Sequence, residues 1–277
     1  MRAVAFTVDV DRDVNLVCQG QACSISQARG GDSSPRFSSS LSGLRAILEV
    51  LEATGISGTF FWEGRSAEAL SRSCPVRELM RGHEVAAHGY DHEDFPGAES
   101  GLPLDRGQVR TVLERTEEAL NGAFGPESRG FRAPYQRTSP PLLEELVGRG
   151  YLYDSSDTVR MVEGSVMPFR REDGLMEAPV CWTLDRRGGR IVSYLWPYHE
   201  GKRPMEDYLD LLDDFQEGLL VLATHSWHLT DCFCSGPRSR EEVRRGKEDL
   251  GRLLHHGLDS GARFVRLADH LGGVGEG

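Results

Sequence analysis

The chain has 277 residues, of which 39% are hydrophobic and 27% are charged, and its net charge at pH 7 is −11. This size and composition are typical of a soluble globular protein with one large domain or two small ones. The excess of acidic side chains argues against binding to nucleic acid or to an anionic membrane surface, because both partners are negatively charged. No apolar run approaches the roughly 18 residues of a transmembrane helix, so no membrane span is expected.

The N-terminal sequence goes directly into a strand-like run, without the long apolar stretch of a signal peptide. The six cysteines are too few for a disulfide scaffold in a chain of this length. We therefore expect a cytoplasmic protein. Whether it forms a homo-oligomer is left open by the sequence.

The first third of the chain alternates between strand and helix patterns. Residues 3–10 predict a strand, and its period of two places Asp9 and Asp11 on the same side. The polar segment 12–40, rich in Gly and Ser, is predicted to be one long loop. An amphipathic helix is expected from about Ser40 to Gly55. Strands are then predicted over 58–62 and 84–87, and the second of these runs into His88.

The same alternation continues to the C-terminus. Strands are predicted over 130–135, 151–155, 175–180, 219–223 and 263–267. Helices are predicted over 105–124, 139–149, 205–217 and 239–258. Alternating strands and helices indicate parallel βα units. No linker or internal repeat interrupts them, so we predict an α/β fold in a single domain over residues 1–277.

Polar and titratable residues stand where the predicted strands end, and this edge carries the active site in parallel α/β barrels. The residues at these positions are Asp9, Asp11, His88, His92, Arg132, Asp154 and His225. Two imidazoles four residues apart can face one point in space and bind a transition metal. The spacing alone is also what two unrelated histidines would give, so the third ligand and the neighbouring acids decide the interpretation.

Four motifs in order resemble those of a known family. They are the acidic segment Thr7-Val8-Asp9-Val10-Asp11, the pair His88-Gly89-Tyr90-Asp91-His92, the run Arg132-Ala133-Pro134-Tyr135, and Leu222-Ala223-Thr224-His225. Together they resemble the polysaccharide deacetylases with NodB homology, carbohydrate esterase family 4. The stretches GFRAPY, YLYDSS and MEAPVCWTLD look most like its allantoinase-like and peptidoglycan-deacetylase-like branch. The resemblance implies a distorted (β/α)7-type barrel.

The resemblance also implies roles for individual residues. Asp11, His88 and His92 would bind one divalent transition metal, with zinc as the first choice and cobalt or nickel as alternatives. Asp9 would be the catalytic base and His225 the acid, and Arg132 would keep Asp9 ionised. Asp154 would orient His225 in the same way, or else only cap its own turn.

This sequence departs from the family pattern at two points. The acids of the first motif are separated by Val10 instead of being adjacent, so which of Asp9 and Asp11 binds the metal is left open. The family's Asp-Trp motif is not obvious in this sequence, and Trp182 is predicted to supply the aromatic wall of the pocket instead. Pro134 and Tyr135 are expected to contact the substrate beside it.

The predicted function is metal-dependent deacetylation of an N-acetylated sugar or polysaccharide, by hydrolysis of a carbon–nitrogen bond. The alternative is a cytoplasmic amidase or deformylase that acts on a small cyclic imide, ureide or formamido sugar. A third class is a carbohydrate-binding relic without catalysis. Four cysteines outside the motifs, at 18, 23, 232 and 234, are expected either to meet in disulfides or a second metal site or to remain free thiols.

Overall fold

The computed structural model describes residues 1–126 and 129–272. A curled sheet, parallel through its centre, dominates it, with strand order β10-β11-β7-β6-β5-β4-β1-β14-β12-β13. Because β11 and β12 lie toward opposite ends of this order but are joined by Ala178 and Pro179 alone, the sheet curls back into an incomplete barrel. The predicted distorted α/β barrel is therefore confirmed.

The strands that form the barrel are mostly short. In chain order they are β1 (Arg2–Val10), β4 (Thr59–Trp62), β5 (Glu84–Ala87), β6 (Gly130–Phe131), β7 (Tyr153–Asp154), β8 (Thr158–Arg160), β9 (Ser165–Val166), β10 (Phe169–Arg170), β11 (Met176–Glu177), β12 (Val180–Leu184), β13 (Arg190–Val192), β14 (Glu217–His225) and β15 (Arg263–Phe264). The predicted strand at 175–180 is split into β11 and β12. The short strands β8, β9, β10 and β13 have no clear period in the sequence and were not predicted.

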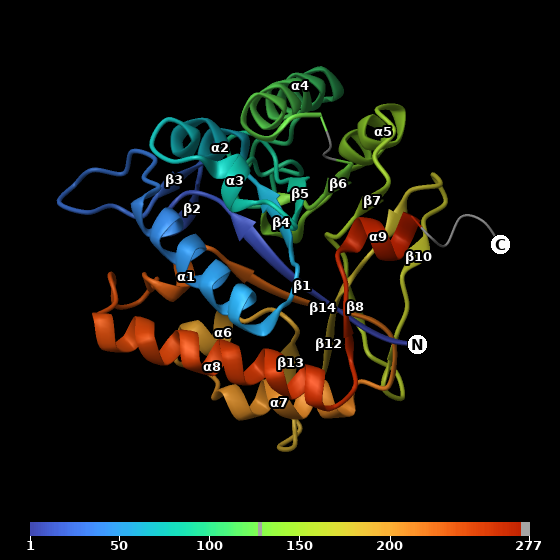
Figure 1. Ribbon diagram of the computed structural model, residues 1–277. Helices are drawn as coiled ribbons and strands as arrows, with labels where there is room; N and C mark the ends of the chain where they lie inside the picture. Colours follow the sequence, from blue (N-terminus) through green and yellow to red (C-terminus); the bar gives the residue numbers. More distant parts are fainter. Residues whose placement is uncertain (127–128, 273–277) are drawn as a thin grey trace.

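Helices cover the outside of the sheet (Figure 1). They are α1 (Ser38–Thr54), α2 (Gly64–Ser71), α3 (Val76–Leu79), α4 (Arg106–Phe124), α5 (Pro140–Gly148), α6 (Trp196–His199), α7 (Met205–Asp214), α8 (Arg240–Asp259) and α9 (Leu267–Gly272), with 3-10 turns η1 (Pro134–Gln136) and η2 (Trp227–Leu229). In Figure 1, α1, α7 and α8 lie on one side of the sheet and α2 to α5 follow around it. None of the helices in the described ranges is long and apolar enough to cross a membrane.

The alternation along β1 decides which side chains enter the barrel. Val4, Phe6 and the other even-numbered positions pack outward against the helices. Ala3 and Ala5 point inward, into a second cluster in which small side chains dominate because the interior is narrow. Asp9 continues this inward row at the carboxyl end of the strand, which places a charged group inside the barrel mouth.

The segment 12–40 is not one long loop, and this prediction was wrong. It contains a two-stranded antiparallel sheet, β2 (Asn15–Cys18) and β3 (Gln21–Ser26), before α1 begins at Ser38. Gly20, with φ +79°, supplies the turn between the strands. The surrounding Gly and Ser residues masked the strand patterns of these four and six residues in the sequence. The hairpin packs against the loop that carries the two histidines, where Cys23 pairs with Glu93.

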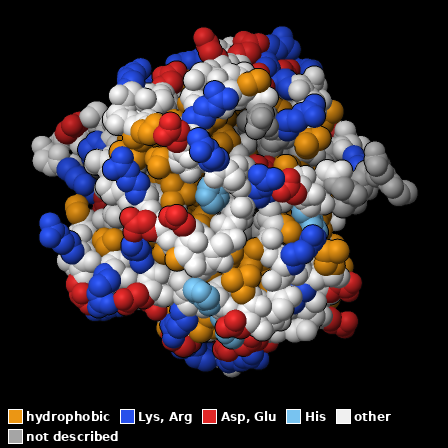
Figure 2. Space-filling model, in the orientation of Figure 1, with side chains coloured by type: hydrophobic (Ala, Val, Ile, Leu, Met, Phe, Trp, Pro, Cys, Tyr) orange, Lys and Arg blue, Asp and Glu red, His pale blue; other side chains and the backbone are white. Residues whose placement is uncertain are grey.

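Acidic and basic side chains are interspersed on the face of the molecule seen in Figure 2, without a large patch of one sign. This mixture agrees with the many ion pairs between surface side chains, such as Arg244 with Glu241 and Glu248.

Candidate active site

Asp9 and His225 are neighbours because of strand register. Strands β1 and β14 run parallel, and Asp9 is the direct partner of His225 at the last position of their pairing. Both side chains lie on the inward row of their strands, so the carboxylate and the imidazole face the same space at the mouth of the barrel. The sequence placed each at a strand end, and the parallel register sets them at one height.

Arg132 holds Asp9 in place. Its Nη1 donates to Asp9 Oδ1 at 2.8 Å and to Thr7 Oγ1 at 3.0 Å, and its other nitrogens donate to the carbonyl and hydroxyl of Ser155. Burial acts to raise the pKa of Asp9, but Arg132, with smaller contributions from His88 and His225, outweighs burial and holds that pKa below its ordinary value. Asp9 is therefore ionised at neutral pH, and the predicted contact with Arg132 is present.

Asp11, His88 and His92 form a compact group of potential metal ligands. One carboxylate oxygen and one nitrogen from each imidazole all lie within 4.8 Å of one another, and all three residues are buried. Asp11 Oδ2 is 3.3 Å from His92 Nε2 and 3.8 Å from His225 Nε2. Among the residues that the structure describes, no other group of three or more His, Cys, Asp and Glu side chains has a geometry that could hold a metal ion.

Hydrogen bonds on the far side of each ligand fix its orientation. His88 Nδ1 lies 2.7 Å from the carbonyl oxygen of Arg132, so it donates there and leaves Nε2 free. His92 Nδ1 lies 3.1 Å from Ser24 Oγ, which itself donates to the carbonyl of His92. Asn15 Nδ2 donates to Asp11 Oδ2. Such outer contacts set the tautomer of a ligating histidine and the direction of its lone pair.

The residues present fit a divalent cation. Asp11 Oδ1 and His92 Nε2 are buried without a hydrogen-bond partner, which is costly unless something binds them. Burial lowers the pKa of His88 and, more strongly, of His92, so both imidazoles are neutral and able to act as ligands. Burial and the nearby carboxylates of Glu63 and Asp9 raise the pKa of Asp11. A cation would relieve this unbalanced negative charge.

The loop from His88 to His92 is shaped by special backbone positions. Gly89 has φ +72°, and a Cβ there would come within 2.6 Å of Glu93 Oε2. Glu93 is buried and accepts from the backbone N–H groups of Tyr90 and Asp91. Burial raises the pKa of Glu93 to about 7. His92 itself has φ +52°, a rare conformation for a residue with a Cβ. Glu93 therefore stabilises the turn that aims both imidazoles at Asp11.

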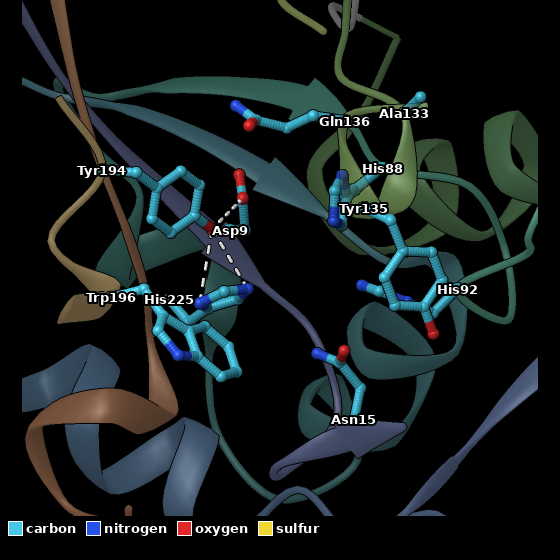
Figure 3. Close-up of a pocket in the computed structure, with 10 residues that line it drawn as sticks. All are labelled: Asp9, Asn15, His88, His92, Ala133, Tyr135, Gln136, Tyr194, Trp196 and His225. Atoms are coloured by element: carbon cyan, nitrogen blue, oxygen red, sulfur yellow. Dashed lines mark hydrogen bonds between the residues drawn. The ribbon is translucent and has the colours of Figure 1, made fainter. Parts of the chain in front are cut away.

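Tyr194 links the two residues with predicted acid–base roles. Its hydroxyl donates to Asp9 Oδ2 at 2.6 Å and lies 3.0 Å from His225 Nε2 (Figure 3). Burial lowers the pKa of His225 well below its ordinary value, although Asp9 acts in the opposite direction. Sequence reasoning did not find Tyr194, because it lies in an irregular segment just after β13 and shows no motif.

A cavity of about 260 Å³ opens above these groups. Its lining is drawn in Figure 3 and consists of Asp9, Asn15, His88, His92, Ala133, Tyr135, Gln136, Tyr194, Trp196 and His225. Tyr135, predicted to contact substrate, lies in this wall, with its ring edge-on to His92 at 4.6 Å between centroids and its hydroxyl bonded to Ser24. Asn15 and Ser24 come from the hairpin that was predicted to be loop.

Two predicted substrate contacts are not part of this cavity. Trp182 lies in β12 beneath the guanidinium groups of Arg160 and Arg190, at 5.4 and 4.7 Å from its ring centroid. Trp196, at the start of α6, supplies the aromatic wall instead. Pro134 is buried, and its ring lies close to Gly89. The cavity lining supports neither prediction, because nearness in sequence to a motif does not fix the direction of a side chain.

Asp154 does not orient His225, and that prediction was wrong as well. The Asp154 carboxylate accepts a hydrogen bond from Ser156 Oγ at 2.5 Å and forms an ion pair with Arg171. In the sheet, Asp154 of β7 is the register partner of Glu177 in β11. Burial raises the pKa of Asp154 to about 6. Ser156 Oγ also accepts from the backbone N–H of Ala133. Asp154 thus fixes the turn that supports the Arg132–Tyr135 loop, which is the second role considered for it.

The cysteines are free thiols. Cys23 lies in β3, where burial and the nearby Glu93 raise its pKa to about 12. Cys232 donates to Glu200 Oε2 at 3.2 Å, and the same carboxylate accepts from His228 Nε2 at 3.0 Å and from the N–H of Phe233. Glu200 therefore holds the loop after β14 together, and neither disulfides nor a second metal site links the cysteine pairs in the described structure.

Comparison with known sequences points to one family. The family model described as polysaccharide deacetylase matches residues 37–153. A peptidoglycan deacetylase-like protein of Gibberella zeae is 31% identical over 116 residues, which are 41% of this chain and 32% of that protein. A peptidoglycan deacetylase of Helicobacter pylori is 29% identical over 114 residues, 41% of this chain and 36% of that protein. The matches thus span about a third of the length of these relatives.

Solved structures share the fold along nearly the whole chain. A protein of Mycobacterium smegmatis, provisionally described as a polysaccharide deacetylase, superposes with a TM-score of 0.68 at 23% identity, covering 98% of this chain and 89% of that one. A family 4 carbohydrate esterase of Streptomyces lividans, crystallised with acetate, gives 0.54 at 17% identity, with 95% and 91% covered. A family 4 pseudoenzyme of Bacillus anthracis gives 0.56 at 14% identity, with 98% and 65% covered. Because this fold also carries a pseudoenzyme, activity has to be argued from the site residues.

Proposed function

We propose that the chain is a member of the polysaccharide deacetylase family, whose model matches residues 37–153, and that it is a metal-dependent hydrolase that removes the acetyl group from an N-acetylated sugar. One observation carries the proposal. His88 and His92 line the same cavity as the register pair Asp9 and His225, and Asp11 completes the ligand group beside them, 3.8 Å from His225 Nε2. A metal site, a carboxylate ionised at neutral pH and an imidazole are thereby gathered around one space.

Zinc is the metal that we propose for this site. Two neutral imidazoles and one carboxylate are a ligand set that zinc accepts, and such a set leaves a position open for water or substrate. When bound, the metal would supply Lewis-acid chemistry, making a water molecule more acidic and polarising the amide carbonyl.

The chain's own residues would handle the protons. Asp9, ionised and aimed by Arg132, would take the proton of the attacking water at Oδ2. His225 would donate a proton to the leaving nitrogen, a step that is needed because an amide anion is a very poor leaving group. His225 is neutral at pH 7 when the site is empty of substrate, so it has to acquire that proton during the reaction. The Tyr194 hydroxyl contacts both groups and offers a path between them.

Replacing Tyr194 by Phe should lower kcat about 10–100-fold, the equivalent of losing a hydrogen bond to a charged group. KM and metal content should stay unchanged, because the ring that lines the cavity is kept. Tyr198→Phe is the matched control, since its hydroxyl donates to the Asp249 carboxylate at 2.7 Å away from the cavity. Equal turnover of the two variants would refute a role for the Tyr194 hydroxyl in proton movement.

The function is tested by product analysis with chelated and zinc-reloaded protein. N-acetylglucosamine oligomers should release acetate only after zinc is restored. Formate from a formamido sugar, or a ring-opened product from a cyclic ureide, would instead favour the alternative amidase function. If zinc binds at one equivalent and none of these substrates is hydrolysed, the proposed activity is wrong and the chain resembles a pseudoenzyme.

A further inference from the structure

Gln136 lines the cavity, and its side-chain amide nitrogen makes no hydrogen bond within the described chain. It lies one residue after the Arg132–Tyr135 motif, in η1, and its carboxamide stands on the side of the cavity opposite Asn15, with Asp9 and Tyr194 between them (Figure 3). Its Nε2 is buried and has no hydrogen-bond partner in the described chain. Leaving a buried donor unpaired costs free energy, so native structures seldom keep one without a reason.

The backbone here is strained. Tyr135 and Gln136 are consecutive residues with φ of +59° and +55°, in the left-handed region that residues with a Cβ avoid. The backbone N–H of Gln136 donates to the carbonyl of Ala133 at 3.0 Å, which closes the turn without help from the Gln136 side chain. Strain of this kind is kept at functional sites where it directs a side chain. The two left-handed residues place one side chain beside His92 and the next over the cavity.

The charges around the cavity restrict what Gln136 can meet. None of the described residues that line it is Lys or Arg. The guanidinium of Arg132 is buried and already occupied by Asp9, Thr7 and Ser155. The guanidinium of Arg137, 5.9 Å from the Tyr135 ring, lies outside the lining and pairs with Glu99. A carboxylate on the substrate would approach Asp9 with no side-chain cation to receive it. An uncharged oxygen can accept a hydrogen bond from a carboxamide, and rotation of the terminal torsion can turn the Gln136 donor toward the cavity at low cost.

We propose that Gln136 is a substrate-binding residue that selects an uncharged sugar unit by donating a hydrogen bond from its side-chain amide to a hydroxyl or carbonyl oxygen beside the reacting amide. The inference rests on the proposed function and adds a recognition contact to it. The aromatic side chains of Trp196 and Tyr135 line the cavity and would supply apolar surface for a sugar ring. When the substrate is bound, the unpaired amide gains a hydrogen-bond acceptor, and the strained turn holds the side chain beside that acceptor.

Binding can be separated from turnover by calorimetric titration of the Asp9→Asn protein with N-acetylglucosamine tetramer and with an analogue that carries a carboxylate. Adding Gln136→Met, which keeps the length of the side chain, should raise Kd for the neutral tetramer about tenfold. Gln136→Glu keeps the shape but replaces the donor by an anion, and it should raise that Kd further. The carboxylate analogue should bind more weakly than the tetramer to the protein with Gln136 intact.

Gln136→Gly distinguishes recognition from a structural role. Glycine relaxes a φ of +55°, so Tm should stay the same or rise, while affinity for the tetramer falls about tenfold as with Met. Glu163→Gly is the matched control, because Glu163 is exposed, has φ +49° and lies outside the cavity. It should change Tm in the same direction and leave Kd unaltered.

Two results would overturn the role of Gln136 and leave the proposed function intact. In one, tetramer affinity is unchanged in Gln136→Met and Gln136→Gly although the wild-type protein releases acetate. In the other, affinity and Tm fall together in both variants, which would make the side chain structural. If zinc-loaded wild-type protein hydrolyses no N-acetylated sugar and the Asp9→Asn protein binds none, the proposed function fails and this inference fails with it.

Discussion

Asp9→Asn is expected to lose about 10²–10⁴-fold in turnover while keeping the metal, as removal of a general base does. Asp11→Asn is expected to lose the metal. Asp11 belongs to the ligand group with His88 and His92, whereas Asp9 Oδ1 and Oδ2 are engaged by Arg132 and Tyr194. The structure thus separates two acids that the sequence could not tell apart. Metal content by atomic spectroscopy and acetate release together test the assignment.

The pair of variants has a built-in control for folding. Both substitutions keep the side-chain volume, and both proteins can be checked for cooperative thermal unfolding before metal is measured. The assignment would be reversed if Asp9→Asn lost zinc and Asp11→Asn retained it. If both variants kept zinc and lost turnover equally, neither acid would be an essential ligand, and the group around Asp11 would not be the metal site.

Arg132→Met is expected to destabilise the folded protein by about 3–5 kcal/mol at pH 7, because it leaves the buried Asp9 carboxylate without its partner. Turnover should fall as well, since Asp9 loses both its orientation and the positive charge of Arg132 that keeps it ionised. Urea unfolding of the metal-free protein measures the loss of stability without the contribution of ligand binding. Arg187→Met is the control, since Arg187 makes an exposed ion pair with Asp207 and should change stability little.

The stability lost in Arg132→Met should depend on pH, and the direction of this dependence follows from the pKa of Asp9. In the wild-type protein the pKa of Asp9 lies below its ordinary 3.8, so its stabilising contribution is present above pH 3.8 and is lost as the pH falls through the lower folded value. Without Arg132 burial is no longer offset, and the folded pKa should rise above 3.8. The Asp9 contribution to stability then falls as the pH rises through that window. The stability difference between wild type and variant should therefore be larger at pH 7 than at pH 4.

Arg132→Lys keeps a positive charge and should recover part of the stability and the wild-type sign of the pH dependence. A difference between wild type and Arg132→Met that is the same at pH 4 and pH 7 would mean that lost packing, such as the contact of the guanidinium with the Phe61 ring at 4.1 Å, causes the destabilisation. In that case the Asp9–Arg132 pair would not set the ionisation of the base.

The residues at strand ends could be predicted from sequence because their placement depends on local rules. The alternation of inward and outward side chains along residues 3–10 places Asp9 inside the barrel. An apolar strand that ends at His88 or His225 places that side chain at the open end of the barrel. The order of the motifs then indicated one site. The structure brings Asp9, Asp11, His88, His92, Arg132 and His225 together there.

Other parts of the site were decided by tertiary structure. Ser24 and Asn15 come from a hairpin hidden in a Gly- and Ser-rich segment, and Tyr194 and Trp196 from a segment of short strands without a period. Trp182 and Asp154 stood at plausible positions in the sequence but face Arg160 and Arg171 instead. Their direction depends on side-chain pairing between segments far apart in the chain. Strand periodicity acts over a few residues and carries no information about those distant pairings, so only the folded structure decides them.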